Sequence, residues 1–178
     1  MQADRHPVAL VRAASEDDWP TVRSVRLRAL ADAPTAFGTT LAEARELTDD
    51  RWRERARGSA TSRLFLARLG EQAVGMAGIF DEGDGSAQVI SVWVAAEHRG
   101  RGVARALTAA AVDFAAAAGI ARIRLWVTDG NAAARGLYEH LGFSPTGRHQ
   151  PLPSEPSLEE HEMEIRAAPP QGAAPPTR

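Results

Sequence analysis

The chain has 178 residues, of which 44% are hydrophobic and 25% charged, with a net charge of −2 and no cysteine. These values are typical of one globular domain, and they give no reason to expect nucleic acid or an anionic membrane as a partner. Without cysteine there is no disulfide, no thiolate metal ligand and no cysteine nucleophile. No signal-peptide pattern and no bilayer-length apolar stretch stands out, so we expect a cytoplasmic protein.

The first half of the chain predicts two helices and three strands. Capping residues from Ser15 to Asp18 precede Trp19-Pro20, a pattern that predicts a helix to about Ala31. Thr48 is placed to cap a second helix that carries Trp52. Runs of β-forming residues predict strands at 8–12, 63–68 and 73–80, the last two being an antiparallel pair joined by a tight turn.

The most informative stretch, from Gln88 to Ala118, predicts a strand, a turn and a helix. The strand ends at Val94, and apolar residues at three-, four- and seven-residue steps predict a helix from Gly102 or Val103. The turn between them reads Arg99-Gly100-Arg101-Gly102-Val103-Ala104. Its glycines let the backbone approach a ligand closely, and the free N–H groups at a helix start attract anions. We therefore expect a phosphate or pyrophosphate here.

Three phosphate-binding patterns compete for this turn, beside a turn that binds no ligand. The P-loop pattern needs a lysine, and the chain has none. A dinucleotide-binding loop would place the bulky Arg105 where a small residue packs helix on strand, although Asp129 imitates its ribose-binding acid. The third pattern, [QR]-x-x-G-x-[GA], is matched by Arg99, Gly102 and Ala104. It is similar to the acyl-CoA loop of the GCN5-related N-acetyltransferases, the GNAT family.

A second motif lies downstream, after a strand predicted at 122–127. A helix connects that strand to the one before the Arg/Gly turn, so the two strands should be parallel neighbours. The pattern N-x-x-A-x-x-L-Y-x-x-x-G-F of the same family is matched at Asn131, Ala134, Leu137, Tyr138, Gly142 and Phe143. Because both motifs occur in the family's order, the chain resembles the GNAT family from Val8 to Arg166, nearly its whole length.

This resemblance implies a mixed α/β fold. A central, mostly antiparallel sheet would splay at one parallel pair of strands and be flanked by about four helices. One N-acetyltransferase domain would cover residues 1–166, followed by a disordered tail, rich in proline and alanine, at 167–178. The proline-rich stretch at 144–160 is expected to be irregular, with a last strand at 161–166. Exposed sheet edges of this kind often pair, so a homodimer is one expected assembly.

The resemblance also implies where acetyl-CoA would bind. Its pantetheine arm would lie in the splayed slot, and its pyrophosphate would lie on the Arg/Gly turn. The implied cofactor-binding residues are Val92, Trp93, Val94, Arg99, Gly100, Arg101, Gly102, Val103, Ala104, Asn131, Ala134 and Tyr138. On the acceptor side, Phe37, Glu43 and Trp52 are candidates, with the alternative that the aromatic residues are core anchors and the glutamate is solvated.

The implied reaction is direct transfer of an acetyl group from acetyl-CoA to a primary amine of a small molecule or peptide. Tyr138, the one tyrosine of the chain, is the expected general acid. A phenol, with a pKa near 10, is close to a thiol at about 8.5 and can protonate the leaving thiolate. The alternative is that its ring only packs in the helix face.

The general base stays unassigned. Candidates are Glu97, Asp129, Glu162 and Glu164, and the alternatives are a water chain or an amine that arrives neutral. Relatives that acetylate protein N-termini often carry a glutamate where this chain has Trp126, which weakens that particular activity. A CoA-binding regulatory module without catalysis and a dinucleotide-dependent oxidoreductase remain as alternatives. The histidines show no metal-ligand spacing, so no metal is expected.

Overall fold

The described part of the chain, residues 9–167 of a computed structural model, forms a seven-stranded sheet in the order β1-β2-β3-β4-β5-β7-β6. All neighbouring strands are antiparallel except β4 and β5, which are parallel. The strands are β1 (Leu10–Ala13), β2 (Arg63–Leu69), β3 (Gln72–Asp81), β4 (Ser86–Val94), β5 (Arg122–Thr128), β6 (Ser144–Leu152) and β7 (Glu155–Arg166). The expected mixed fold with one parallel pair is confirmed.

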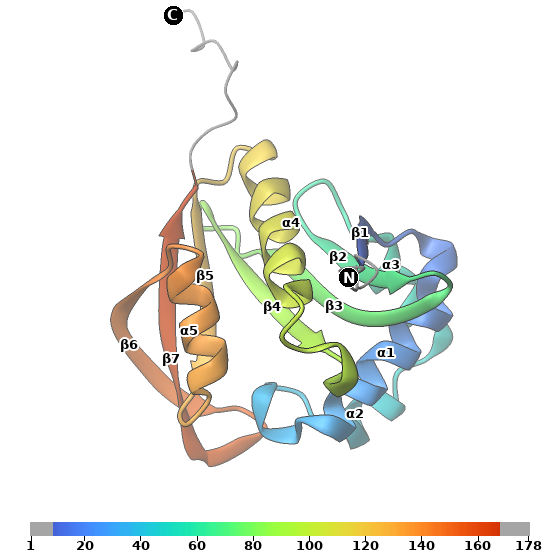
Figure 1. Cartoon of the computed structure of the whole chain (residues 1–178), viewed down its shortest axis with the longest axis horizontal. Helices are drawn as coiled ribbons and strands as arrows, with labels where there is room; N and C mark the ends of the chain where they lie inside the picture. Colours follow the sequence, from blue (N-terminus) through green and yellow to red (C-terminus); the bar gives the residue numbers. More distant parts are fainter. Residues whose placement is uncertain (1–8, 168–178) are drawn as a thin grey trace, which may run out of the picture.

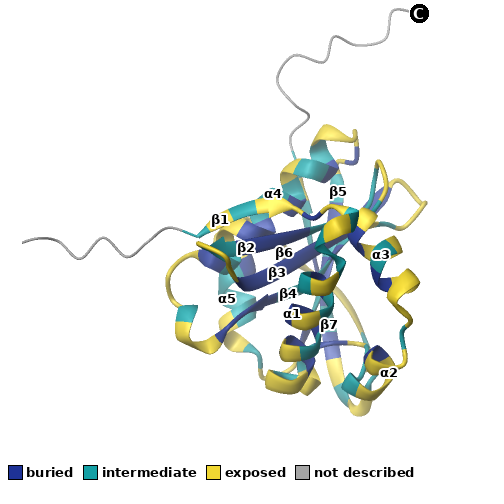
Figure 2. Ribbon diagram, turned by 90° about the vertical axis from the view of Figure 1, so that its right-hand side faces the viewer, coloured by how far each residue is buried: buried dark blue, intermediate teal, exposed yellow. Residues whose placement is uncertain are grey.

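Helices cover both faces of the sheet (Figure 1). They are α1 (Trp19–Asp32), α2 (Leu41–Arg45), α3 (Asp49–Arg57), α4 (Val103–Ala117) and α5 (Ala132–His140). Successive residues of a strand point to opposite faces, so β2 sends Phe65 into the apolar cluster under α4 and α5, and Leu66 into the cluster under α1 and α3. The middle strands β3 and β4 are buried between these layers (Figure 2).

The parallel pair separates after three residues. β4 and β5 are in register from Ser86↔Arg122 to Gln88↔Arg124 and then diverge. Further along β4, its pairing with β3 shifts by one residue around Ser91, which has φ +58°. Such a bulge bends a strand. The sheet is therefore open on one side of β4, in the V-shaped arrangement that the resemblance implies.

The prediction for residues 144–160 was wrong. This stretch forms β6 and the first half of β7, which pair in antiparallel register. Its prolines suggested an irregular segment, but β6 is the outermost strand, where Pro145 and Pro151 can leave their missing N–H groups on the unpaired side. Between residues 9 and 167, no helix is long and apolar enough to cross a membrane. The predicted tail, apart from Ala167, lies outside the described residues.

Candidate active site

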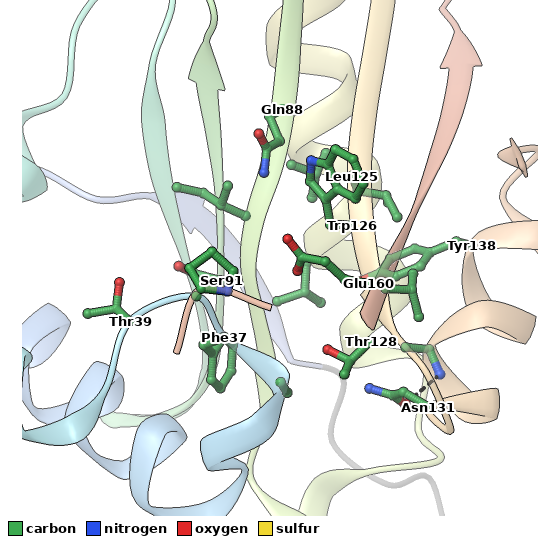
Figure 3. Close-up of a pocket in the computed structure, with 18 of the residues that line it drawn as sticks. Phe37, Thr39, Gln88, Ser91, Leu125, Trp126, Thr128, Asn131, Tyr138 and Glu160 are labelled. Atoms are coloured by element: carbon green, nitrogen blue, oxygen red, sulfur yellow. Dashed lines mark hydrogen bonds between the residues drawn. The ribbon is translucent and has the colours of Figure 1, made fainter. Parts of the chain in front are cut away.

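Two cavities meet where β4 and β5 separate. The larger has a volume of about 780 Å³ and lies beside the Arg/Gly turn and α5. The smaller, about 380 Å³, lies between β4, β5, β7 and the loop before α2 (Figure 3). Residues that line both cavities mark their junction: Ala36, Phe37, Val92, Asn131, Ala134 and Tyr138. A molecule in one cavity can thus meet a molecule in the other without entering it.

The Arg/Gly turn forms the anion-attracting end of the larger cavity. Gly100 and Gly102 have φ values of +72° and +77°, which favour glycine, and a Cβ on either would meet open space. Ala106 N donates to Gly102 O at 3.0 Å, the first bond of α4. The N–H groups of residues 103–105, which come before this bond, have no acceptor within the helix. They point out of its N-terminus, where an anionic ligand can bind.

The side chain of Arg99 is held by protein groups beside this turn. Its Nε donates to Val94 O at 2.9 Å, and its Nη2 pairs with the carboxylate of Asp32. The same Asp32 oxygen accepts a hydrogen bond of 2.8 Å from Trp93 Nε1. The bond from Trp93 and then the contact with Arg99 lower the pKa of Asp32, so the carboxylate stays ionised. Asp32 thus fixes the wall of the larger cavity.

At Val94, the backbone N–H and C=O of β4 face the gap between β4 and β5. Ala95 N donates to Val74 O on β3 at 2.8 Å, and adjacent residues of an antiparallel strand direct these groups to opposite sides. The N–H of Val94 therefore faces the side that β5 has left. Its carbonyl is occupied by Arg99, so the N–H is the group that a ligand can reach.

Helix α5 places Asn131 and Tyr138 at the junction. Asn131 Oδ1 accepts from Ala134 N at 3.1 Å and caps the helix, as predicted. Tyr138 is buried, with its ring packed edge-on to Phe143 at 5.9 Å between centroids. Burial raises the pKa of the Tyr138 phenol. The phenol therefore keeps its proton at neutral pH and is a donor, not a base.

The smaller cavity carries charged groups from two different elements, α1 and β7. Glu160 on β7 is 8% exposed, and its Oε1 accepts from Gln150 Nε2 at 2.7 Å. Burial raises the pKa of Glu160, which the bond from Gln150 partly offsets. Arg26 on α1 lines the cavity beside Phe37. Figure 3 shows Glu160 and Tyr138 extending into the cavity from β7 and α5.

A known protein family matches most of the chain that forms this site. The model described as "Acetyltransferase (GNAT) family" matches residues 26–143, from the middle of α1 to the end of the second motif. The chain belongs to the GNAT family. The matched segment includes the loop before α2, the Arg/Gly turn and the junction of the cavities, but not Gln150, Pro153 and Glu160 of the smaller cavity.

Several relatives agree with this assignment. A mycothiol acetyltransferase of Beutenbergia cavernae is 33% identical over 140 residues, which cover 76% of this chain and 43% of that protein. The chain thus spans less than half the length of this curated relative. A GCN5-related N-acetyltransferase from Kribbella flavida is 27% identical, with a TM-score of 0.71, covering 90% of this chain and 98% of that one. A putative acetyltransferase from Salmonella typhimurium, solved with its cofactor acetyl-CoA, shares the fold at 20% identity and a TM-score of 0.71, covering 96% and 99%.

The residues matched to the GNAT cofactor pattern lie together, with one exception. Arg101 is exposed and lines neither cavity, whereas Arg105 lines the larger one. The sequence did not predict Arg105 as a cofactor-binding residue, because its size was considered only as evidence against a dinucleotide-binding loop. On a helix, position 105 lies one turn beyond position 102, so it faces the same end of the cavity.

On the acceptor side, the structure brings one of the three candidates to a cavity. Phe37 lines both cavities. Glu43 lies away from them, because its Oε2 accepts from Thr40 N at 2.7 Å in a capping box of α2. Trp52 is 1% exposed and packs in the core under α1 and α3. The alternative of a core anchor thus describes Trp52, and Glu43 serves its own helix.

None of the four base candidates lines either cavity in the described residues. Glu162 accepts from Arg148 Nη1 at 3.1 Å and from Thr146 Oγ1 at 2.8 Å, a structural ion pair. Asp129 pairs with His161 Nε2 at 2.8 Å on the surface. With Glu159, these two residues bring ligand atoms within 4.8 Å of one another, a spacing that the histidine count did not reveal.

Three cavity residues were missed by sequence reasoning. Glu160 lay one residue outside the predicted last strand, although the alternation Glu160, Glu162, Glu164 could have revealed it had β7 been recognised. Asp32 lay one residue beyond the predicted helix end. Arg26 falls on the buried side of α1, where an apolar residue is the usual choice, and no sequence motif marks it.

Proposed function

We propose that this chain transfers an acetyl group from acetyl-CoA directly to a primary amine of a small molecule or peptide. The observation that carries the proposal is the junction of the two cavities at Val92 and Tyr138. Direct transfer needs donor and acceptor bound at the same time with their reacting atoms adjacent. Two cavities that meet at a common set of lining residues provide that arrangement.

The larger cavity suits the CoA part of the donor. The outward N–H groups at the start of α4 can bind the pyrophosphate, and the absence of side chains at Gly100 and Gly102 leaves it room. Val92 and Val94 border the slot in which a pantetheine arm can pair with the strand. A GNAT relative of the same fold was solved with acetyl-CoA, which supports this donor.

We assign three catalytic roles: one to Tyr138 at the junction, one to Val94 in the larger cavity and one to Glu160 in the smaller cavity. The N–H of Val94 faces the gap and can stabilise the oxyanion that develops when the amine attacks. Tyr138, protonated and buried beside both cavities, can donate its proton to the leaving thiolate. Glu160, with a raised pKa in the acceptor cavity, can take the proton that an ammonium must lose before attack.

A CoA-binding module without catalysis is the second candidate. It requires the larger cavity alone and gives no role to the smaller one. Glu160 is an argument against it, because burying a carboxylate costs stability and a CoA-binding module would give this residue no function. The two candidates differ in turnover, not in CoA affinity.

A ligand titration followed by an amine panel tests the proposal. Thermal shift is measured with acetyl-CoA, CoA, NADH and ATP, and ligands that bind the native state raise stability by roughly 2.7 kcal/mol at a hundredfold excess over Kd. We expect shifts with acetyl-CoA and CoA. Thiol release is then measured with primary amines, including the acceptor of the mycothiol acetyltransferases. Binding of CoA without release for any amine would favour the module, and a shift with NADH alone would overturn the donor.

A further inference from the structure

We propose that the acceptor is a small amine that also carries a carboxylate, and that Arg26 binds this carboxylate. The inference rests on the proposed acetyl transfer and names the substrate class of the same site. Its starting point is a buried arginine in the smaller cavity for which the described protein provides no counter-ion.

Arg26 occupies an interior position of α1. It is four residues from both Val22 and Leu30, which are 0% and 1% exposed, and is itself 8% exposed. Residues four apart share one helix face, so the guanidinium enters the layer between α1 and the sheet. Arginine is almost never buried to this extent without a paired charge.

Within residues 9–167, Arg26 has no carboxylate within 4.0 Å, and its buried Nη1 has no hydrogen-bond partner. Two other arginines of α1 and α3 do have carboxylate partners: Arg23 pairs with Asp49 at 3.4 Å and Arg57 with Glu16 at 2.8 Å. Burial, and then repulsion from Arg55, lower the pKa of Arg26 to about 10. The side chain is still charged at neutral pH, and a bound anion would offset the unfavourable burial.

Arg26 lines the smaller cavity, so part of its guanidinium is available to a ligand, although Nη1 is buried. Its Cζ lies 4.5 Å from the centre of the Phe37 ring, so one flat face is covered by an aromatic surface. Stacking occupies the face of the group, while its N–H donors lie along the edge. Two N–H groups in a fixed fork match the two oxygens of a carboxylate. Both residues line the smaller cavity, which places the fork where an acceptor would bind.

A second charged residue of the same cavity complements the amine. Glu160 on β7 presents a carboxylate to the same cavity and is proposed to receive the amine's proton. A cavity of about 380 Å³ accommodates a molecule of amino-acid size. Cationic Arg26 on α1 and anionic Glu160 on β7 together fit a molecule with an anionic and an ammonium group. A neutral amine would leave Arg26 buried and unpaired.

Binding is tested first, on the protein saturated with CoA. Ligand-observed NMR and thermal shift are recorded with the common α-amino acids, with ω-amino acids of increasing length, and with the carboxamide of each. We expect at least one amino acid to bind roughly 30-fold or more tightly than its carboxamide, from the usual effect of losing one partner of a buried charge pair. Equal binding of acids and amides, or binding of none, would overturn the inference whether or not the protein turns over.

The variant Arg26→Gln identifies the residue responsible, with Arg23→Gln as a control that removes the same charge from the same helix. Arg26→Gln should abolish the preference for acid over amide, raise the acceptor KM and leave the acetyl-CoA Kd unchanged, while its melting temperature stays the same or rises. Arg23→Gln should keep the preference. A retained preference in Arg26→Gln would overturn the assignment.

The outcomes separate this inference from the proposed function. If neutral amines are acetylated as efficiently as amino acids and Arg26→Gln has no effect, the inferred carboxylate site is wrong and the proposed acetyltransferase activity stands. If amino acids bind selectively but no thiol is released, Arg26 stands as the carboxylate site and the proposed acetyltransferase activity is wrong.

Discussion

Trp93 Nε1 donates a 2.8 Å hydrogen bond to Asp32 Oδ2, which joins the end of α1 to β4 across 61 residues of sequence. Arg99 reaches the same oxygen from the start of the Arg/Gly turn. One carboxylate therefore connects the helix layer, the sheet and the loop that we propose binds the pyrophosphate.

Replacing this carboxylate should loosen the connection. We expect Asp32→Ala to lower the free energy of unfolding by about 1–2 kcal/mol at pH 7, since both donors lose their acceptor at a partly exposed site. Urea denaturation measures the change. Asp17→Ala, at an exposed acid just before the start of α1, is the control and should change little.

The effect of Asp32→Ala should depend on pH. The folded protein lowers the pKa of Asp32, so its contribution is present above the ordinary aspartate pKa, near 4, and is lost as the pH falls through the lowered value. Wild type and variant should therefore converge as the pH falls through this lowered pKa. If the difference in unfolding free energy between wild type and variant stays constant from pH 7 to pH 3, the charge of Asp32 does not stabilise the fold.

Gly102→Leu should remove acetyl-CoA binding. The new side chain would project into open space of the larger cavity and adopt an unfavourable positive φ, at a cost of about 1–2 kcal/mol. Gly85→Leu is the matched control, with φ +80°, an open Cβ position and no place in either cavity. Calorimetric titration should show lost affinity in the first variant alone. Equal affinity in both would refute the loop assignment.

Tyr138→Phe should lower kcat by about a hundredfold, a typical contribution of general acid catalysis, and leave the Kd of acetyl-CoA unchanged. The ring keeps its contact with Phe143, so the melting temperature should change little. Steady-state kinetics and calorimetry measure the two quantities. A kcat within twofold of wild type would leave Tyr138 as a packing residue.

Glu160→Gln should lower kcat/KM by about a hundredfold at pH 7. Because burial raises the pKa of Glu160, wild-type activity should rise with pH through a value above the ordinary glutamate pKa of about 4.3, and the variant should lack this limb. Glu159→Gln, at the adjacent exposed position, is the control and should retain the wild-type profile. The same acidic limb in Glu160→Gln would assign it to another group.

The sequence was most informative where a backbone conformation required a residue type. Gly102 at a positive φ and Asn131 as a helix cap were predictable, because few other residues fit those positions. The separation of β4 from β5 followed from the resemblance, not from the residues themselves. The parallel pairing followed from the helix that connects the two strands.

The acceptor side was less predictable, since tertiary contacts decide it. Pro145 and Pro151 suggested a loop because a local pattern does not show that β6 is an edge strand. That error hid Glu160. Arg26 looked like one of many arginines on a helix, and its burial depends on how α1 lies against the sheet. Residues whose role depends on distant neighbours carry no local mark.

The division of the site into two cavities has an evolutionary consequence. The turn between β6 and β7 and the side chain of Arg26 border the acceptor cavity, while the Arg/Gly turn borders the donor cavity. Under the proposed function, we expect substitutions in that hairpin to change which amine is acetylated and to leave acetyl-CoA binding unchanged. Laboratory selection for new acceptors should accordingly begin at Pro153, because Gln150 in the same hairpin holds the proposed base Glu160.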